Sequence, residues 1–186
     1  MTPEEFVDFN ASHSVFDFLT VFPKEKLSGI KCSKDTLIFL TQTGIPTYAA
    51  PHFYFGDFEG RYLPALCDWP WRKRQYAKNL KAWVIGCDPD EFPVCILEYG
   101  QLFIFKTSQD RQLLNSSIPQ AIEAFAAYAV MIDKAMAECG EDACISNNIP
   151  EYLISEFEQR LFSIEKSCCF NSSFWRDELR RLKKES

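Results

Sequence analysis

The sequence has few of the residues on which catalysis and phosphate binding commonly depend. It contains two histidines and seven glycines in 186 residues. Histidine is the side chain that most often serves as a general base near neutral pH, but neither His13 nor His52 stands in a recognisable catalytic motif. Gly56 and Gly60 are the only glycines within four residues of each other, which excludes a P-loop and a dinucleotide fingerprint. We therefore expect no catalytic residues and no nucleotide cofactor.

The sequence also lacks long apolar runs and a dense set of cysteines. Without a run of membrane-spanning or signal-peptide length, we expect no membrane association and a cytoplasmic location. The eight cysteines make up about 4% of the 186 residues, below the roughly 8–10% of a secreted disulfide scaffold, so reduced thiols are expected. Cys139-x4-Cys144 and the adjacent Cys168-Cys169 have no second pair or histidines at ligand spacing, so no metal is expected.

The sequence is rich in aromatic residues, and its acidic and basic residues are concentrated in different segments. The chain holds 17 Phe, 7 Tyr and 4 Trp, enough large apolar side chains to build a substantial core. The formal net charge is −6, yet residues 61–86 carry six basic side chains and one acidic, whereas residues 87–100 carry four acidic and no basic ones. The segment 69–74, WPWRKR, combines rings and cations in the manner of a single-strand stacking platform. It is short and isolated, so a loop with packed tryptophans is the preferred interpretation and no direct nucleic-acid binding is expected.

The middle of the chain predicts an antiparallel sheet. Residues 52–56 have the pattern of a strand, and apolar runs of strand length follow at 81–86, 93–98 and 101–105, separated by short turns. Leu113 and Leu114 are expected to add a short last strand. Successive strands with short turns form an antiparallel meander.

Helices are predicted on both sides of this region. Thr2, Pro3 and Glu5 indicate the start of a helix over residues 2–11. Ser33 is expected to cap a helix with Leu37, Phe39 and Leu40 inward, which Gly44 ends. Apolar residues recur every three or four positions from Ile118 to Met136, behind a start at Ser116 or Ser117 and Pro119, and two further helices are expected at 150–165 and 172–184. We predict one α+β domain over residues 1–186: an antiparallel sheet flanked by helices, with 118–186 mainly helical.

The order of these elements resembles the SUKH superfamily. The resemblance rests on motifs in sequence: a helix closing in Thr43-Gly44-Ile45-Pro46, then Val84-Ile85-Gly86, the strands at 94–98 and 101–103 turning at Gly100, Asn115-Ser116-Ser117 opening a long helix, and Phe174-Trp175 in the last helix. It is most similar to the subgroup of bacterial immunity proteins with a GLP-like helix end and an NSS helix start. The tight turn Glu98-Tyr99-Gly100 departs from the family pattern.

This resemblance implies a protein that is not an enzyme. Members of the superfamily are typically antidotes that bind and neutralise a cognate secreted polymorphic toxin, often a nuclease or a nucleic-acid-modifying enzyme. Such a toxin presents basic groups to phosphates, so an acidic surface would bind it quickly. We therefore expect a partner-binding face made of carboxylates and aromatic anchors, which are Asp57, Glu59, Asp88, Asp90, Glu91, Tyr54, Trp69 and Trp71.

Two alternatives remain open from sequence. The first is a general protein- or peptide-binding regulatory module that is not tied to a toxin. The second is a small hydrolase that uses a cysteine with His52. For each residue of the expected face, a solvated turn or a core ring is the simpler structural interpretation.

Overall fold

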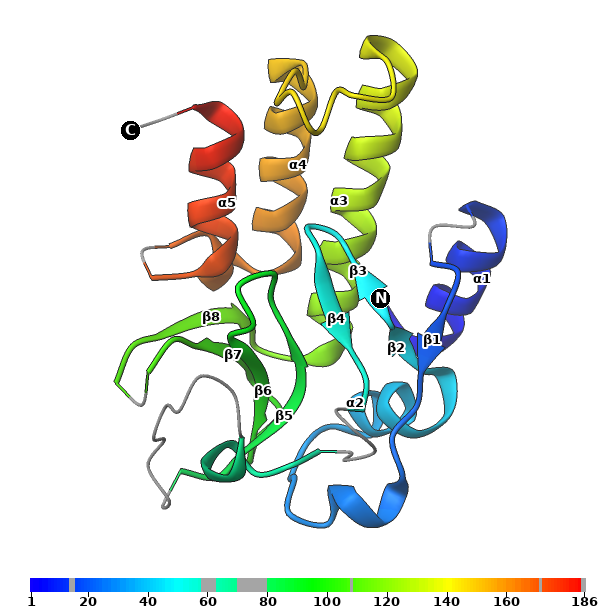
Figure 1. Cartoon of the computed structure of the whole chain (residues 1–186). Helices are drawn as coiled ribbons and strands as arrows, with labels where there is room; N and C mark the ends of the chain where they lie inside the picture. The colour runs from blue at the N-terminus through cyan, green and yellow to red at the C-terminus, as the bar shows by residue number, and fades with distance from the viewer. Residues whose placement is uncertain (14–15, 58–62, 70–79, 108, 171, 185–186) are drawn as a thin grey trace.

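An antiparallel six-stranded sheet forms the centre of the computed structural model, which describes residues 1–13, 16–57, 63–69, 80–107, 109–170 and 172–184. The strands are hydrogen-bonded in the order in which they occur in the chain (Figure 1). They are β3 (Tyr48–Ala49), β4 (Phe53–Phe55), β5 (Ala82–Cys87), β6 (Pro93–Leu97), β7 (Leu102–Phe105) and β8 (Arg111–Asn115). A separate two-stranded sheet pairs β1 (Leu19–Thr20) with β2 (Ile45–Pro46). The predicted α+β class and its meander are confirmed.

The helices begin and end within two residues of their predicted positions when the π-helical turn after α2 is counted with that helix. Their bounds are α1 (Pro3–His13), α2 (Lys34–Ile38), α3 (Ile118–Cys139), α4 (Glu151–Ile164) and α5 (Phe174–Lys183), and a π-helical turn at Phe39–Thr43 extends α2. Thr2 and Glu5 form a capping box at α1, and the Ser117 hydroxyl accepts the Gln120 N–H at 3.4 Å at the start of α3. Helices α3, α4 and α5 lie side by side at one end of the sheet (Figure 1).

The sheet has a buried layer on each face. Side chains alternate between the two faces along β5, so Val84 and Ile85 are both fully buried but belong to different clusters, and a register shift follows between Val84 and Gly86. Gly86 is needed at this point because a Cβ there would lie 2.4 Å from the Tyr54 carbonyl oxygen of β4. The absence of a side chain therefore lets β4 pair closely with β5.

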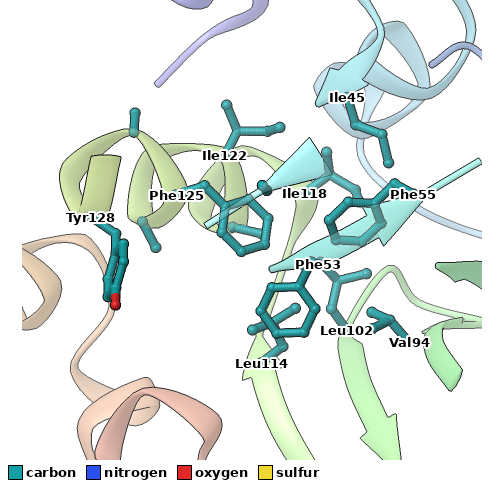
Figure 2. Packing of buried hydrophobic residues seen from close by; sticks show 14 of the residues in the cluster. Ile45, Phe53, Phe55, Val94, Leu102, Leu114, Ile118, Ile122, Phe125 and Tyr128 are labelled. Carbon is teal, nitrogen blue, oxygen red and sulfur yellow. The ribbon is translucent and has the colours of Figure 1, made fainter. Parts of the chain in front are cut away.

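The main core lies between the sheet and α3. Figure 2 shows Phe125 of α3 lying against Phe53 and Phe55 of β4, with ring centroids 5.6 and 5.7 Å apart. The cluster extends without a break from Phe6 of α1 to Leu182 of α5. Leu37, expected to face inward, is 37% exposed, because Phe39 and Leu40 occupy the inner positions of that helical segment.

A buried polar network joins the sheet to the last two helices. Asn115, at the end of β8, is fully buried; its amide nitrogen donates to Glu165 Oε2 at 3.0 Å and its Oδ1 accepts from Trp175 Nε1 at 3.0 Å. The Glu165 carboxylate also accepts from the Ser116 backbone N–H and from the hydroxyls of Ser116 and Ser167. The polar groups of this network thus satisfy one another without water.

Replacing Asn115 by alanine is expected to destabilise the chain by about 2–4 kcal/mol, because two buried partners, Glu165 and Trp175, each lose a hydrogen bond. Urea denaturation of Asn115→Ala measures this loss. Asn148→Ala is the matched control, since Asn148 is exposed, and should change the free energy of unfolding by less than about 0.5 kcal/mol. Equal stability of the two variants would contradict the importance assigned to the network.

Candidate functional site

A tight turn presents the predicted acidic residues between β5 and β6. The Asp88 carboxylate accepts the Phe92 backbone N–H at 2.8 Å, and the Glu91 N–H donates to the Asp88 carbonyl at 3.0 Å. Glu91 takes a positive φ of 62°, which closes the turn. Asp88 and Glu91 are half-buried, whereas Asp90 is exposed. The turn therefore holds Asp88 firmly and projects Asp90 into solvent.

This turn forms one wall of a groove beside α5. The groove has a volume of about 620 Å³ and is built from segments distant in the sequence: the turn before β4, the β5–β6 turn, Lys106 after β7, β8, α3 and the loop after it, and α5. Figure 1 shows how α5 and α3 stand at the end of the sheet where these segments meet. We call this site the α5 groove; its charged and titratable lining is His52, Asp88, Asp90, Lys106, Tyr128, Cys144, Asp177, Glu178 and Arg181.

Arg181, Glu178 and Tyr128 form a compact ion-paired network in the groove lining. Arg181 donates to both carboxylate oxygens of Glu178, at 2.8 and 2.7 Å, and the Tyr128 hydroxyl donates to the same carboxylate at 2.6 Å. The hydrogen bond to Glu178 raises the pKa of Arg181, and burial followed by the charge of Glu178 raises the pKa of Tyr128. Both groups stay protonated at neutral pH, so Glu178 and Arg181 cancel each other's charge.

The other carboxylates of the groove are less well compensated. Burial raises the pKa of Asp88, and the charge of Asp90 adds to this effect, while the Phe92 N–H and Lys106 oppose it. Asp177 accepts from the neutral Gln112 amide at 2.5 Å, and its nearest cation, Arg180, lies 3.9 Å away. Four carboxylates and two cationic side chains line the groove in total, which makes it acidic.

Two further described residues of the predicted face, Tyr54 and Asp57, contact each other, because the Tyr54 hydroxyl donates to the Asp57 carbonyl oxygen at 3.2 Å. Tyr54 pairs with Cys87 across β4 and β5, next to Asp88 in the chain, and its ring lies 5.4 Å from that of Tyr48. Asp88 lies beside the start of β4, because Tyr54 pairs with Cys87, whereas Asp57 follows the end of β4. The two residues are therefore three or four positions apart along the strand direction, which is roughly 10–13 Å at about 3.3 Å per residue. Asp57 therefore does not join the β5–β6 turn in one compact cluster. Glu59 and Trp71 lie outside the described residues.

Trp69 requires a correction. We expected its ring to be a surface anchor, but it is 4% exposed and packs in a small cluster with Leu66, Ala82, Val84, Cys95 and Phe105. This cluster covers the face of the sheet opposite α3. The simpler interpretation of Trp69, a core ring, is the one that the structure supports.

Sequence reasoning missed the part of the groove that comes from the C-terminal half. Asp177, Arg181 and Ile145 line it, and Ile145 is 88% exposed. Ile145 could have been noticed as an isolated aliphatic residue in a polar loop. No local signal, however, predicts that α5 packs beside a turn some 85–90 residues earlier in the chain.

The thiols near His52 are poor nucleophiles in this structure. Burial raises the pKa of Cys87 to about 11, and burial also raises the pKa of Cys144, which lines the same groove as His52. Both stay protonated at neutral pH, whereas the thiolate is the reactive form. Among the described residues, no hydrogen bond joins the imidazole of His52 to a thiol.

The described part of the chain holds no group of three or more His, Cys, Asp or Glu side chains placed to bind a metal ion. Within the same residues, none of the helices is both long and apolar enough to cross a membrane. All eight cysteines are free.

The chain matches no protein-family model, and comparison with curated proteins and with solved structures gives no significant match. The resemblance to the SUKH superfamily therefore remains a prediction from the sequence.

Asp88→Asn is expected to stabilise the folded chain at neutral pH. Because the pKa of folded Asp88 is raised, ionisation of this carboxyl costs stability; the cost is absent below the ordinary value of 3.8 and develops as the pH rises through the folded pKa. The asparagine oxygen can still accept the Phe92 N–H. Denaturation at pH 7 should show a higher free energy of unfolding for the variant, with no gain at pH 3. A loss at pH 7, or an equal gain at both pH values, would contradict the assignment.

Proposed function

We propose that this chain is a SUKH-like immunity protein that binds and neutralises a cognate secreted polymorphic toxin, a nuclease or another nucleic-acid-modifying enzyme. The observation that carries the proposal is the acidic β5–β6 turn, which projects Asp90 from the rim of an acidic groove. An inhibitor needs such a surface rather than a nucleophile. The proposed location is the cytoplasm, where free thiols are stable.

Electrostatics supports this kind of partner. An enzyme that acts on nucleic acid must place cations opposite phosphates, and an acidic protein surface offers those cations an alternative ligand. The carboxylates of Asp88 and Asp90, which form no ion pair within the described residues, line the groove and are positioned for this contact. The same surface would accelerate encounter with the toxin at low ionic strength.

The residues that carry the SUKH resemblance have structural roles. Asn115 and Trp175, from its NSS and FW motifs, bond to each other in the core, and Ser117 caps α3. These motifs therefore have structural explanations. The protonated thiols near His52 count against the hydrolase alternative.

Co-expression with the C-terminal domain of an adjacent gene tests the proposal directly. We expect the chain to rescue growth from a toxic neighbouring domain and to co-purify with it. A neighbouring gene of metabolism or signalling, with a product that binds the chain and has no toxicity, would instead favour the general protein-binding module.

Reversing the charge of Asp88, Asp90 and Glu91 together to lysine should slow association with the toxin domain by about tenfold or more at low salt. The difference should shrink as the salt concentration rises, because screening weakens steering. Stopped-flow mixing measures the association rate.

The matched control reverses Glu4, Asp8 and Glu25, which are exposed residues on α1 and the turn before α2. It changes the net charge by the same amount away from the groove, and should alter the rate much less. An unchanged rate for the turn variant across a range of salt would remove this face from the proposal.

A further inference from the structure

We propose that the α5 groove receives an extended segment of the partner protein, with a lysine or arginine side chain seated among Asp88, Asp90 and Asp177 and an adjacent aliphatic side chain packed on Ile145. This inference rests on the proposed function, because it specifies which part of a toxin the chain holds. The proposed binding site includes Asp177 and Ile145 from the C-terminal half of the chain in addition to the acidic β5–β6 turn.

The size and lining of the groove favour a peptide segment. A volume of about 620 Å³ lies within the roughly 300–1,000 Å³ of sites that enclose drug-sized ligands. Besides its charged groups, the groove has an apolar wall that includes Ile132, Ile145, Ile149 and Phe174. A ligand that satisfies both parts needs a cation and an aliphatic group close together, as neighbouring residues of a polypeptide provide.

The charge pattern favours a cation. Glu178 is already neutralised by Arg181 through two hydrogen bonds, so it needs no further partner. Within the described residues, Asp88 and Asp90 form no ion pair, and Lys106 of the same groove only partly offsets the raised pKa of Asp88. The Asp177 carboxylate accepts from the neutral Gln112 amide and lies 3.9 Å from Arg180. An incoming ammonium or guanidinium group would relieve the repulsion between Asp88 and Asp90.

Ile145 supplies a second, independent observation. This aliphatic side chain is 88% exposed in the loop after α3, far more than the buried isoleucines of the core, although it stands at the edge of a groove. Large apolar groups beside a concave site are typical anchors for a partner residue. The carboxylates that would bind a cation and the aliphatic side chain that would anchor a partner residue thus line the same groove.

Binding of the purified toxin domain to single variants tests the inference. Asp88→Asn, Asp177→Asn and Ile145→Ser should each raise the Kd by about tenfold, through the loss of a charge-assisted contact or of an apolar anchor. Glu25→Gln and Val21→Ser, exposed controls of matched chemistry outside the groove, should change it less than about twofold. A toxin that binds all three groove variants as tightly as the original chain would overturn the inference and leave the immunity function intact.

A second measurement is independent of any toxin. NMR titration of the free chain with blocked hexapeptides, one containing Arg-Leu and the other Gln-Leu, should give saturable shifts at Asp90 and Ile145 for the Arg-Leu peptide. The shifts should be several-fold weaker for the Gln-Leu peptide and for the Asp88→Asn variant. Shifts confined to other surfaces, or equal shifts with spermidine alone at the same concentration, would contradict a peptide site.

Discussion

The amide of Asn115 is the interaction on which the arrangement of the C-terminal half depends. One side chain with a donor and an acceptor connects the end of β8 to the Glu165 carboxylate after α4 and to the indole of Trp175 in α5. All three groups are buried, so a displacement of either helix would leave polar atoms without partners in an apolar environment. This cost fixes the position of α5 more strictly than apolar packing alone.

The position of α5 in turn creates the groove. Trp175 faces the core and packs against Phe125, Phe157 and Tyr128. Glu178 lies three residues later, on the same side of the helix, and bonds to the Tyr128 hydroxyl. Asp177 then faces the β8 residue Gln112, which brings a carboxylate of the last helix into the groove lined by Asp88. The contacts that place α5 against the core therefore also form the candidate site.

Local signals predicted the elements well, because capping residues and apolar periods act over a few positions. The capping box of Thr2 and Glu5, the Ser117 cap and the strands from β4 to β8 are examples. Short strands such as β3 and β1 have two residues each, too few for a period to be recognised. The groove residues Asp177 and Arg181 come together with Asp88 through contacts between distant segments, which no local pattern encodes. The sequence therefore predicted the acidic turn but not the part of the groove that α5 supplies.

The buried carboxylates of the chain differ in how well their charges are compensated by neighbouring groups. The two buried carboxylates of the C-terminal half have several donors each: Glu178 is paired with Arg181 and bonded to Tyr128, and Glu165 accepts from four neutral donors. Asp88 receives no such compensation from an ion pair, although burial and Asp90 both disfavour its charge. The Phe92 N–H and the nearby Lys106 offset only part of this effect, so the pKa of Asp88 stays raised. An external cation supplies the missing partner, which is the physical argument for placing a basic segment in the α5 groove.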